Sequence, residues 1–303
     1  MPMSTPITFT SDGVTLRGTL FTPSEPAATQ VPLVILSSGL GTLHQWSQPT
    51  VDVFVEAGLA CLTFDYRGFG FSDGSPRQEA DPWMLVHDLR TAIDFAQTLP
   101  EVDPERIGLW GTCYGGGPSI VVAAVDPRVK VLVTQVPLIS GGAALRSFSP
   151  PEVIAALTAG LEADRRTIVS GGPRTRLIQV ALDPAQPAVA YDKRSYEWMQ
   201  REAEKTPHWI NELTLQTVGK TIEFEPGDYL PRIGTTPLLM IVADDDVITP
   251  TELTLQAYNR VEGPKQLIRL AGDHFCVYDS ELDLVSNAAR DWFVGHLVQT
   301  SAE

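Results

Sequence analysis

The residue whose neighbours best equip it for chemistry is Cys113, at the centre of the string Gly111-Thr112-Cys113-Tyr114-Gly115. An apolar run precedes this string, and small and apolar residues follow it. A strand, a tight turn and a helix in this order are typical of a strained turn that presents a nucleophile, and the residues two before and two after the nucleophile must be small. The pattern therefore predicts a nucleophilic Cys113. Taken alone, the string also fits a glycine turn with a buried cysteine.

A nucleophile on such a turn needs a base, and the base needs an acid to orient it, in the chain order nucleophile, acid, base. The acidic loop 244–246 follows one apolar run, and His274 follows the next. Side chains that directly follow parallel strands gather at one edge of the sheet. We therefore predict that Cys113, Asp246 and His274 form a catalytic triad.

Short apolar runs alternate with helical patterns along most of the chain. Residues 7–10 and 14–21 flank Ser11-Asp12-Gly13, which indicates a hairpin. Further strands are predicted at residues 31–36, 59–64, 107–110, 129–136, 238–242 and 267–270, and helices at residues 48–57, 82–99, 114–125, 251–261 and 282–298. Apolar strands between helices predict an α/β fold with a mostly parallel, doubly wound sheet.

The alternation breaks after Val136. A helical pattern restarts at Ser149-Pro150-Pro151, and a more polar stretch with aromatic residues follows. We interpret residues 139–228 as a helical cap inserted into a core formed by residues 1–138 and 229–303. Several cap side chains could line a substrate pocket, although packing of the cap onto the core explains the same residues. These candidates are Tyr196, Trp198, Met199, Trp209 and Ile210.

Over nearly its whole length the chain resembles the α/β-hydrolase family. Residues 64–74 look like the turn after the family's fourth strand, and residues 36–41 lie where the family usually has a His-Gly oxyanion loop. Serine replaces that histidine here, but the oxyanion is bound by backbone N–H groups. By position, the resemblance implies that the amides of Leu40 and Tyr114 are these donors.

The resemblance also decides between the three neighbouring acids. Asp244 and Asp245 compete with Asp246, but family members that resemble this loop have the acid three residues before Thr-Pro, which is the position of Asp246. Asp65, at the end of another predicted strand, is expected to organise a turn.

The thiol departs from the family's usual serine. Dienelactone hydrolase and polyhydroxyalkanoate synthase also have Gly-x-Cys-x-Gly-Gly strings, and this chain matches the string through Gly116. Dienelactone hydrolase, however, is compact and lacks a lid. The sequence is compatible with a natural cysteine and with a deliberate replacement of serine.

The triad and the resemblance together predict a hydrolase that acts on ester, lactone or thioester bonds through an acyl-cysteine, with a small-molecule acyl substrate. Because a thiol nucleophile suits transfer as well as hydrolysis, acyl transfer to another acceptor is the alternative. Peptidase activity is less favoured, because a thiolate expels amine leaving groups less well. A non-catalytic receptor on the same fold would usually lack the base that His274 supplies.

Composition excludes several other functions. The net charge is −15, with 22 basic and 37 acidic residues and no basic run, which disfavours nucleic acid as a partner. No membrane-length apolar run or secretory signal is visible, and three cysteines cannot all pair with one another, so we expect a cytoplasmic protein without a membrane partner. We expect no cofactor and no metal. The oligomeric state stays open.

The remaining histidines and Cys276 have simpler interpretations. Cys276 lies two residues after His274 and is expected to be a packed bystander. None of the other histidines has the strand-end context of His274, and each is predicted to be a surface or packing residue: His44, His87, His208 and His296.

Overall fold

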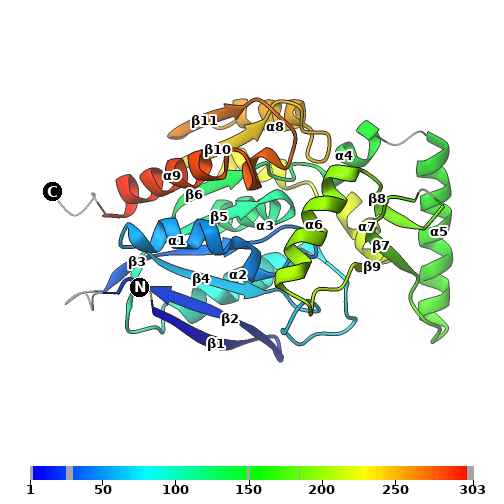
Figure 1. Ribbon diagram of the computed structural model, residues 1–303, viewed down its shortest axis with the longest axis horizontal. Coiled ribbons are helices and arrows are strands. Elements are labelled where there is room, and N and C mark those ends of the chain that lie inside the picture. Colours follow the sequence, from blue (N-terminus) through cyan, green and yellow to red (C-terminus); the bar gives the residue numbers. More distant parts are fainter. Residues whose placement is uncertain (1–2, 25–29, 149–150, 184, 299–303) are drawn as a thin grey trace.

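An eight-stranded sheet forms the centre of the molecule, with the strand order β1-β2-β4-β3-β5-β6-β10-β11 (Figure 1). This computed structural model describes residues 3–24, 30–148, 151–183 and 185–298. Strands β1 and β2 form an antiparallel hairpin, β2 is antiparallel to β4, and the other neighbours are parallel. The predicted α/β fold with a mostly parallel sheet is confirmed. The strands are β1 Met3–Ser11, β2 Val14–Thr22, β3 Val31–Ser37, β4 Ala60–Asp65, β5 Val102–Thr112, β6 Val129–Gln135, β10 Leu238–Ala243 and β11 Lys265–Leu270.

Helices cover both faces of this sheet, which explains why the central parts of its inner parallel strands are apolar and buried. Successive strand residues point to opposite faces, so Leu109 and Trp110 belong to different hydrophobic clusters. One cluster packs beneath α1 (Gln48–Glu56) and α9 (Leu282–Phe293). The other packs beneath α2 (Pro82–Ala96), α3 (Gly116–Val125) and α8 (Thr251–Asn259).

Short helical turns complete the core: η1 His44–Ser47, η2 Cys113–Gly115, η3 Pro226–Arg232, η4 Cys276–Tyr278 and η5 Val294–Val298. The helix expected from residue 114 therefore begins as the turn η2 and becomes α-helical only at Gly116. Cys113 therefore lies in a turn between strand β5 and helix α3, and neither element imposes its regular backbone conformation on the residue.

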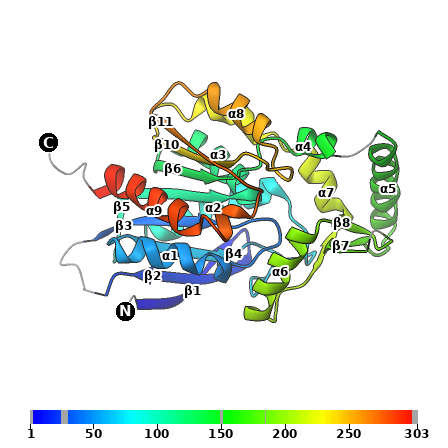
Figure 2. The same cartoon turned by 45° about the horizontal axis from the view of Figure 1, so that its top comes forward.

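Residues 139–228 lie at one end of the molecule, to the right in Figures 1 and 2. They contain the expected helices and also a second, three-stranded sheet with the order β8-β7-β9. The sequence predicted the helices of this segment but not its small sheet. Two of these strands are only three residues long, too short to give an alternating pattern. The elements are α4 Gly141–Phe148, α5 Pro151–Val169, β7 Arg176–Val180, β8 Ala188–Ala190, α6 Lys193–Lys205, β9 Glu212–Thr214 and α7 Leu215–Ile222.

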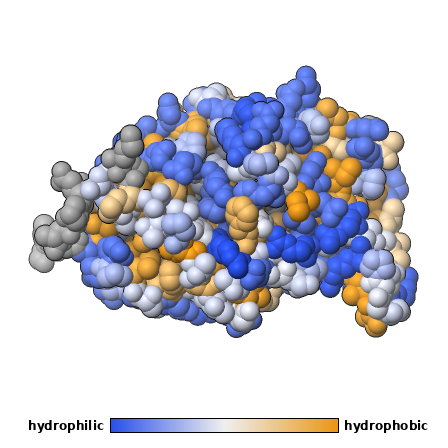
Figure 3. Space-filling model, turned by 60° about the horizontal axis from the view of Figure 1, so that its bottom comes forward, coloured by the Kyte–Doolittle hydropathy of each residue, from blue (hydrophilic) through white to orange (hydrophobic). Residues whose placement is uncertain are grey.

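The helix expected to restart at Ser149-Pro150-Pro151 is α5, which begins at Pro151, while residues 149 and 150 lie outside the described part of the chain. The molecular face seen in Figure 3 intersperses hydrophilic and hydrophobic residues. Across the described residues, every helix is either too short or too polar to cross a lipid bilayer.

Candidate active site

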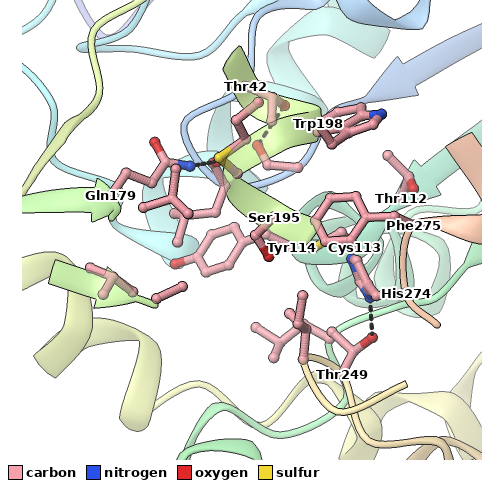
Figure 4. A pocket seen from close by; sticks show the side chains of 18 of the residues that line it. Thr42, Thr112, Cys113, Tyr114, Gln179, Ser195, Trp198, Thr249, His274 and Phe275 are labelled. Carbon is pink, nitrogen blue, oxygen red and sulfur yellow. Dashed lines mark hydrogen bonds between the residues drawn. The ribbon is translucent and has the colours of Figure 1, made fainter. Parts of the chain in front are cut away.

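Cys113 lies on a sharp bend between strand β5 and helix α3. Its φ angle is +50°, in the left-handed region that non-glycine residues rarely occupy. Such a conformation costs about 1–3 kcal/mol and persists only where the surrounding structure imposes it. At this bend the thiol stands at the carboxyl edge of the sheet, facing the cavity shown in Figure 4.

The glycines on either side of Cys113 are required by close backbone contacts. A Cβ atom on Gly115 would lie 2.3 Å from the carbonyl oxygens of Ser37, the last residue of strand β3, and Ser38, which follows it. A Cβ atom on Gly111 would lie 2.5 Å from Ser119 Oγ. The small residues in the sequence therefore let the bend pack directly against β3 and α3.

His274 and Asp246 meet beside this bend, each from a loop that follows a strand. His274 Nδ1 lies 2.7 Å from Asp246 Oδ2, and both side chains are buried. The other carboxylate oxygen of Asp246 accepts the backbone N–H groups of Ile248 and Thr249, at 2.8 and 2.9 Å. These bonds fix the carboxylate, which in turn fixes the imidazole ring and leaves Nε2 free for another partner.

The electrostatic surroundings of His274 favour the protonated ring. Burial lowers its pKa, but the charges of Cys113 and Asp246, and hydrogen bonds to both, raise the pKa of His274 to about 10. A thiolate beside an imidazolium is the state that these interactions stabilise. The arrangement can therefore hold a proton on His274 between Cys113 and Asp246.

The two competing acids lie elsewhere. Asp244 is exposed and its Oδ1 accepts a hydrogen bond from Arg269 Nε at 2.8 Å, and Asp245 is exposed as well. Of the three neighbouring carboxylates, Asp246 is the buried one that contacts His274.

Thr249 is a residue of this site that the sequence reasoning missed. Its hydroxyl lies 2.7 Å from Asp246 Oδ2, 2.9 Å from the carbonyl oxygen of Val136 and 3.3 Å from His274 Nδ1. Figure 4 shows it beside the ring. Part of the signal was present, because an aspartate in a turn commonly accepts a hydrogen bond from the backbone two residues on, as Asp246 does from Ile248.

The candidate oxyanion donors flank Cys113. Tyr114 is the second residue of the turn η2, and the first amides of a helix have no partner within it. Leu40 lies in the loop after β3, and Gly39 of that loop lies close to Cys113, since a Cβ on Gly39 would be 3.6 Å from Cys113 Cβ. Both residues line the cavity together with Cys113 and His274.

The cavity has a volume of about 870 Å³ and lies between the sheet and residues 139–228. Of the five pocket candidates, Trp198 and Met199 line it, and the buried Trp198 ring packs 5.4 Å from the ring of Phe275. Tyr196, Trp209 and Ile210 are not among its lining residues; Ile210 is exposed, and Trp209 contacts the loop after β3. Other lining residues from this segment include Val153, Leu157, Leu177, Gln179, Val189 and Thr221.

The remaining candidates have contacts outside the cavity. The buried Asp65 accepts hydrogen bonds from the backbone N–H groups of His44 and Phe71 and pairs with the His44 ring at 2.9 Å, so it organises its turn. His87 pairs with Asp12, and His208 stacks on Phe71. In the described part of the chain, no group of three or more metal-ligating side chains comes together.

Comparison with known proteins gives consistent matches over most of the chain. A family model described as "Serine aminopeptidase, S33" matches residues 29–273. The thiohydrolase aneE of Aspergillus aculeatus is 31% identical over 85% of this chain and 81% of its own length. The polyketide transferase claH of Penicillium crustosum is 29% identical over 90% of each chain. The crystal structure of the α/β hydrolase GrgF from Penicillium superposes with a TM-score of 0.83 at 28% identity, covering 98% of this chain and 99% of that one.

Proposed function

From its place in the α/β-hydrolase family described as serine aminopeptidase S33, we propose that this enzyme cleaves ester, lactone or thioester bonds. The reaction proceeds in this proposal through an acyl-cysteine at Cys113. The observation that carries the proposal is the buried His274, whose Nδ1 is held by Asp246 and whose pKa is raised by Cys113 and Asp246. A general base must be oriented by a third group in this way to activate a nucleophile.

In the proposed reaction, His274 Nε2 takes the proton of the Cys113 thiol and the sulfur adds to the substrate carbonyl carbon. The N–H groups of Leu40 and Tyr114 bind the oxyanion. The intermediate collapses to a thioester on Cys113, and the proton on His274 passes to the leaving alkoxide or thiolate. Water then adds to the thioester carbonyl while His274 accepts its proton. The C–S bond of this second intermediate breaks, which releases the carboxylic acid, and the departing Cys113 thiolate takes the proton back from His274.

Residues 139–228 serve in this proposal as a cap over the acyl group, on a core formed by residues 1–138 and 229–303. The support is the cavity, whose lining combines Cys113 and His274 from the core with apolar side chains from helices α5, α6 and α7. An apolar wall that faces the sulfur would hold a hydrocarbon acyl chain.

Acyl transfer to an acceptor other than water is the second candidate. It is favoured by relatives that carry the name polyketide transferase, beside others named thiohydrolase. Both reactions share the acyl-cysteine and differ only in what attacks it. Peptide bonds are less suitable substrates, because an amine is a poorer leaving group than the thiolate that would expel it.

The proposal is tested by incubating the protein with a p-nitrophenyl ester and measuring p-nitrophenolate release and intact mass. We expect a mass increase of one acyl group at Cys113, which is lost in Cys113→Ala. Asp246→Asn should slow release at least about a hundredfold, since it removes the acceptor that orients the base. Asp244→Asn is the matched control, because Asp244 bonds to the exposed Arg269, and it should change the rate less than about twofold.

Absence of both turnover and labelling in the unaltered protein would refute the enzyme mechanism. If the label forms but persists in water and is released by an added alcohol or thiol, transfer is the reaction that this site performs. Equal losses in Asp246→Asn and Asp244→Asn would contradict the assignment of Asp246.

A further inference from the structure

The loop after strand β3 is held by its backbone carbonyl groups. Three successive carbonyl oxygens each accept a side-chain hydrogen bond, and two of the three donors come from residues 139–228 rather than from the core. The donors are Thr42 Oγ1 to Gly39 at 3.0 Å, Gln179 Nε2 to Leu40 at 2.6 Å and Trp209 Nε1 to Gly41 at 2.9 Å.

The bond from Gln179 is the most specific of these. Gln179 lies on β7, is 3% exposed and lines the cavity (Figure 4). A carbonyl oxygen only accepts hydrogen bonds, so the amide must turn its NH₂ group toward Leu40. Its Oε1 is then buried with no hydrogen-bond partner, against Gly41, where a Cβ would lie 2.4 Å away.

An unsatisfied buried acceptor costs about 1–3 kcal/mol. The fold therefore keeps an unsatisfied acceptor at Gln179, a residue that contacts the predicted oxyanion loop. Gly41 has a φ of +62°, and any side chain at this position would displace the Gln179 amide. The contact between Gln179 and the loop therefore depends on the Gln179 amide and on the absence of a side chain at Gly41.

Fixing these carbonyls also fixes the amides of the loop. In a trans peptide the N–H points opposite to the C=O of the same peptide unit. The hydrogen bonds from Thr42 to the Gly39 carbonyl thus set the direction of the Leu40 N–H. The bonds from Gln179 and Trp209 fix the two peptide planes that follow, so that the chain on the far side of Leu40 cannot rotate and carry it away. Donors that are held in place before the reaction stabilise an oxyanion best, because they need no reorganisation.

The same segment is also attached to the loop that carries His274. Arg194 on α6 pairs with Asp273 at 3.3 Å and with Asp279 at 2.9 Å. Residues 139–228 therefore contact both sides of the site, the loop after β3 and the loop after β11.

We propose that Gln179 and Trp209 are positioning residues, which hold residues 39–41 so that the Leu40 N–H faces the oxyanion. The inference rests on the proposed acylation of Cys113, the step that hydrolysis and acyl transfer share, and extends it. Residues 139–228 not only cover the substrate but also complete the oxyanion site, so the enzyme is competent only when this segment is seated on the core.

The test compares two reagents on the same thiol. A p-nitrophenyl ester acylates Cys113 through an oxyanion, and the burst of p-nitrophenolate measures that rate. Methyl methanethiosulfonate transfers its methylthio group to the thiolate and releases methanesulfinate, with no oxyanion at a carbonyl. We expect Gln179→Met to slow acylation at least about tenfold, with KM changed little, and to leave methylthiolation within about twofold.

Gln216→Met is the matched control. Gln216 is also a buried glutamine of the segment, but its Nε2 donates to Asp164 at 2.7 Å, away from the loop. Both of its rates should stay within about twofold of the unaltered protein. Trp209→Phe keeps the ring and removes only the N–H, and it should slow acylation in the same selective way; it decides the question if Gln179→Met does not fold.

Acylation of Gln179→Met at the unaltered rate, or an equal loss with both reagents, would overturn this inference while leaving the acyl-cysteine mechanism intact. If the unaltered protein is methylthiolated but never acylated, the proposed function itself fails, and this inference fails with it.

Discussion

At the scale of single residues, the proposed mechanism depends on how the buried His274 is held beside Cys113. Burial alone would lower the pKa of His274 and keep its ring neutral. The Asp246 carboxylate changes this balance, because it is fixed by two backbone N–H groups and lies 2.7 Å from the imidazole. The charged pair is stable only as a pair, and removing one member must alter the other.

The first prediction concerns the titration of His274. Burial lowers its pKa, and the charge of Cys113 is the largest influence that raises it, to about 10. Cys113→Ala should therefore lower the pKa of His274, so that the ring loses its proton at a lower pH than in the unaltered protein. The imidazole resonances in NMR spectra recorded from pH 5 to about 11 measure this directly. The same titration midpoint in both proteins would contradict a charge interaction between the two residues.

At the scale of elements, the bend at Cys113 depends on how closely β5, β3 and α3 approach one another. Gly115 faces backbone oxygens that cannot move without displacing β3, whereas a flexible side chain could have turned aside. The strained φ angle of Cys113 is held by this packing and by the hydrogen bond from the Leu138 N–H to the Cys113 carbonyl at 2.8 Å.

The second prediction follows from this packing. Gly115→Ala would place a methyl group 2.3 Å from two carbonyl oxygens, so it should lower the free energy of unfolding by at least about 1–3 kcal/mol, measured by urea denaturation. The matched control is Gly160→Ala in helix α5, whose new methyl would have its nearest neighbour at 3.8 Å. This change should stabilise the protein by up to about 1 kcal/mol through helix propensity. Equal effects of the two substitutions would show that the bend tolerates a larger residue.

The same elements explain what could be predicted from the sequence. The central parts of strands β3 to β6 and the whole of β10 are buried on both faces, so each contains an apolar run that the sequence shows. The glycines around Cys113 indicate that other backbone segments approach the bend closely. Asp246 follows the buried strand β10, and His274 follows the edge strand β11, whose shorter apolar pattern was still recognisable. Gln179 gives no comparable signal, because its role depends on β7, a five-residue strand whose place beside Leu40 is set by folding over 139 residues of sequence.

Trp209 shows a related limit. Its aromatic character suggested a pocket wall, but in the structure its ring lies 5.6 Å from that of Trp46 and its N–H reaches the carbonyl oxygen of Gly41. An indole supplies both an apolar surface and a single donor. Residue type alone does not decide which of the two a fold uses.

At the scale of the whole molecule, the cavity joins elements that are distant in the chain. Its wall includes Leu40 and Cys113 from the sheet edge, Leu157 from α5 and Trp198 from α6. A volume of about 870 Å³ is large for a short acyl group, and most of the side chains from residues 139–228 that line it are apolar. A longer acyl chain should therefore bury more apolar surface in the cavity when its carbonyl carbon lies beside the Cys113 sulfur.

The last prediction uses this volume. Each buried CH₂ group contributes about 0.8 kcal/mol, so kcat/KM should rise from p-nitrophenyl acetate to the octanoate. Leu157→Trp would fill part of the cavity from α5, and it should lower kcat/KM for the octanoate at least about tenfold while leaving the acetate within about twofold. Ala156→Trp, at an exposed neighbouring position outside the lining, should change neither. If Leu157→Trp slows both esters equally, the acyl chain does not lie against α5, and the space beneath residues 139–228 must instead receive the leaving group or the acceptor.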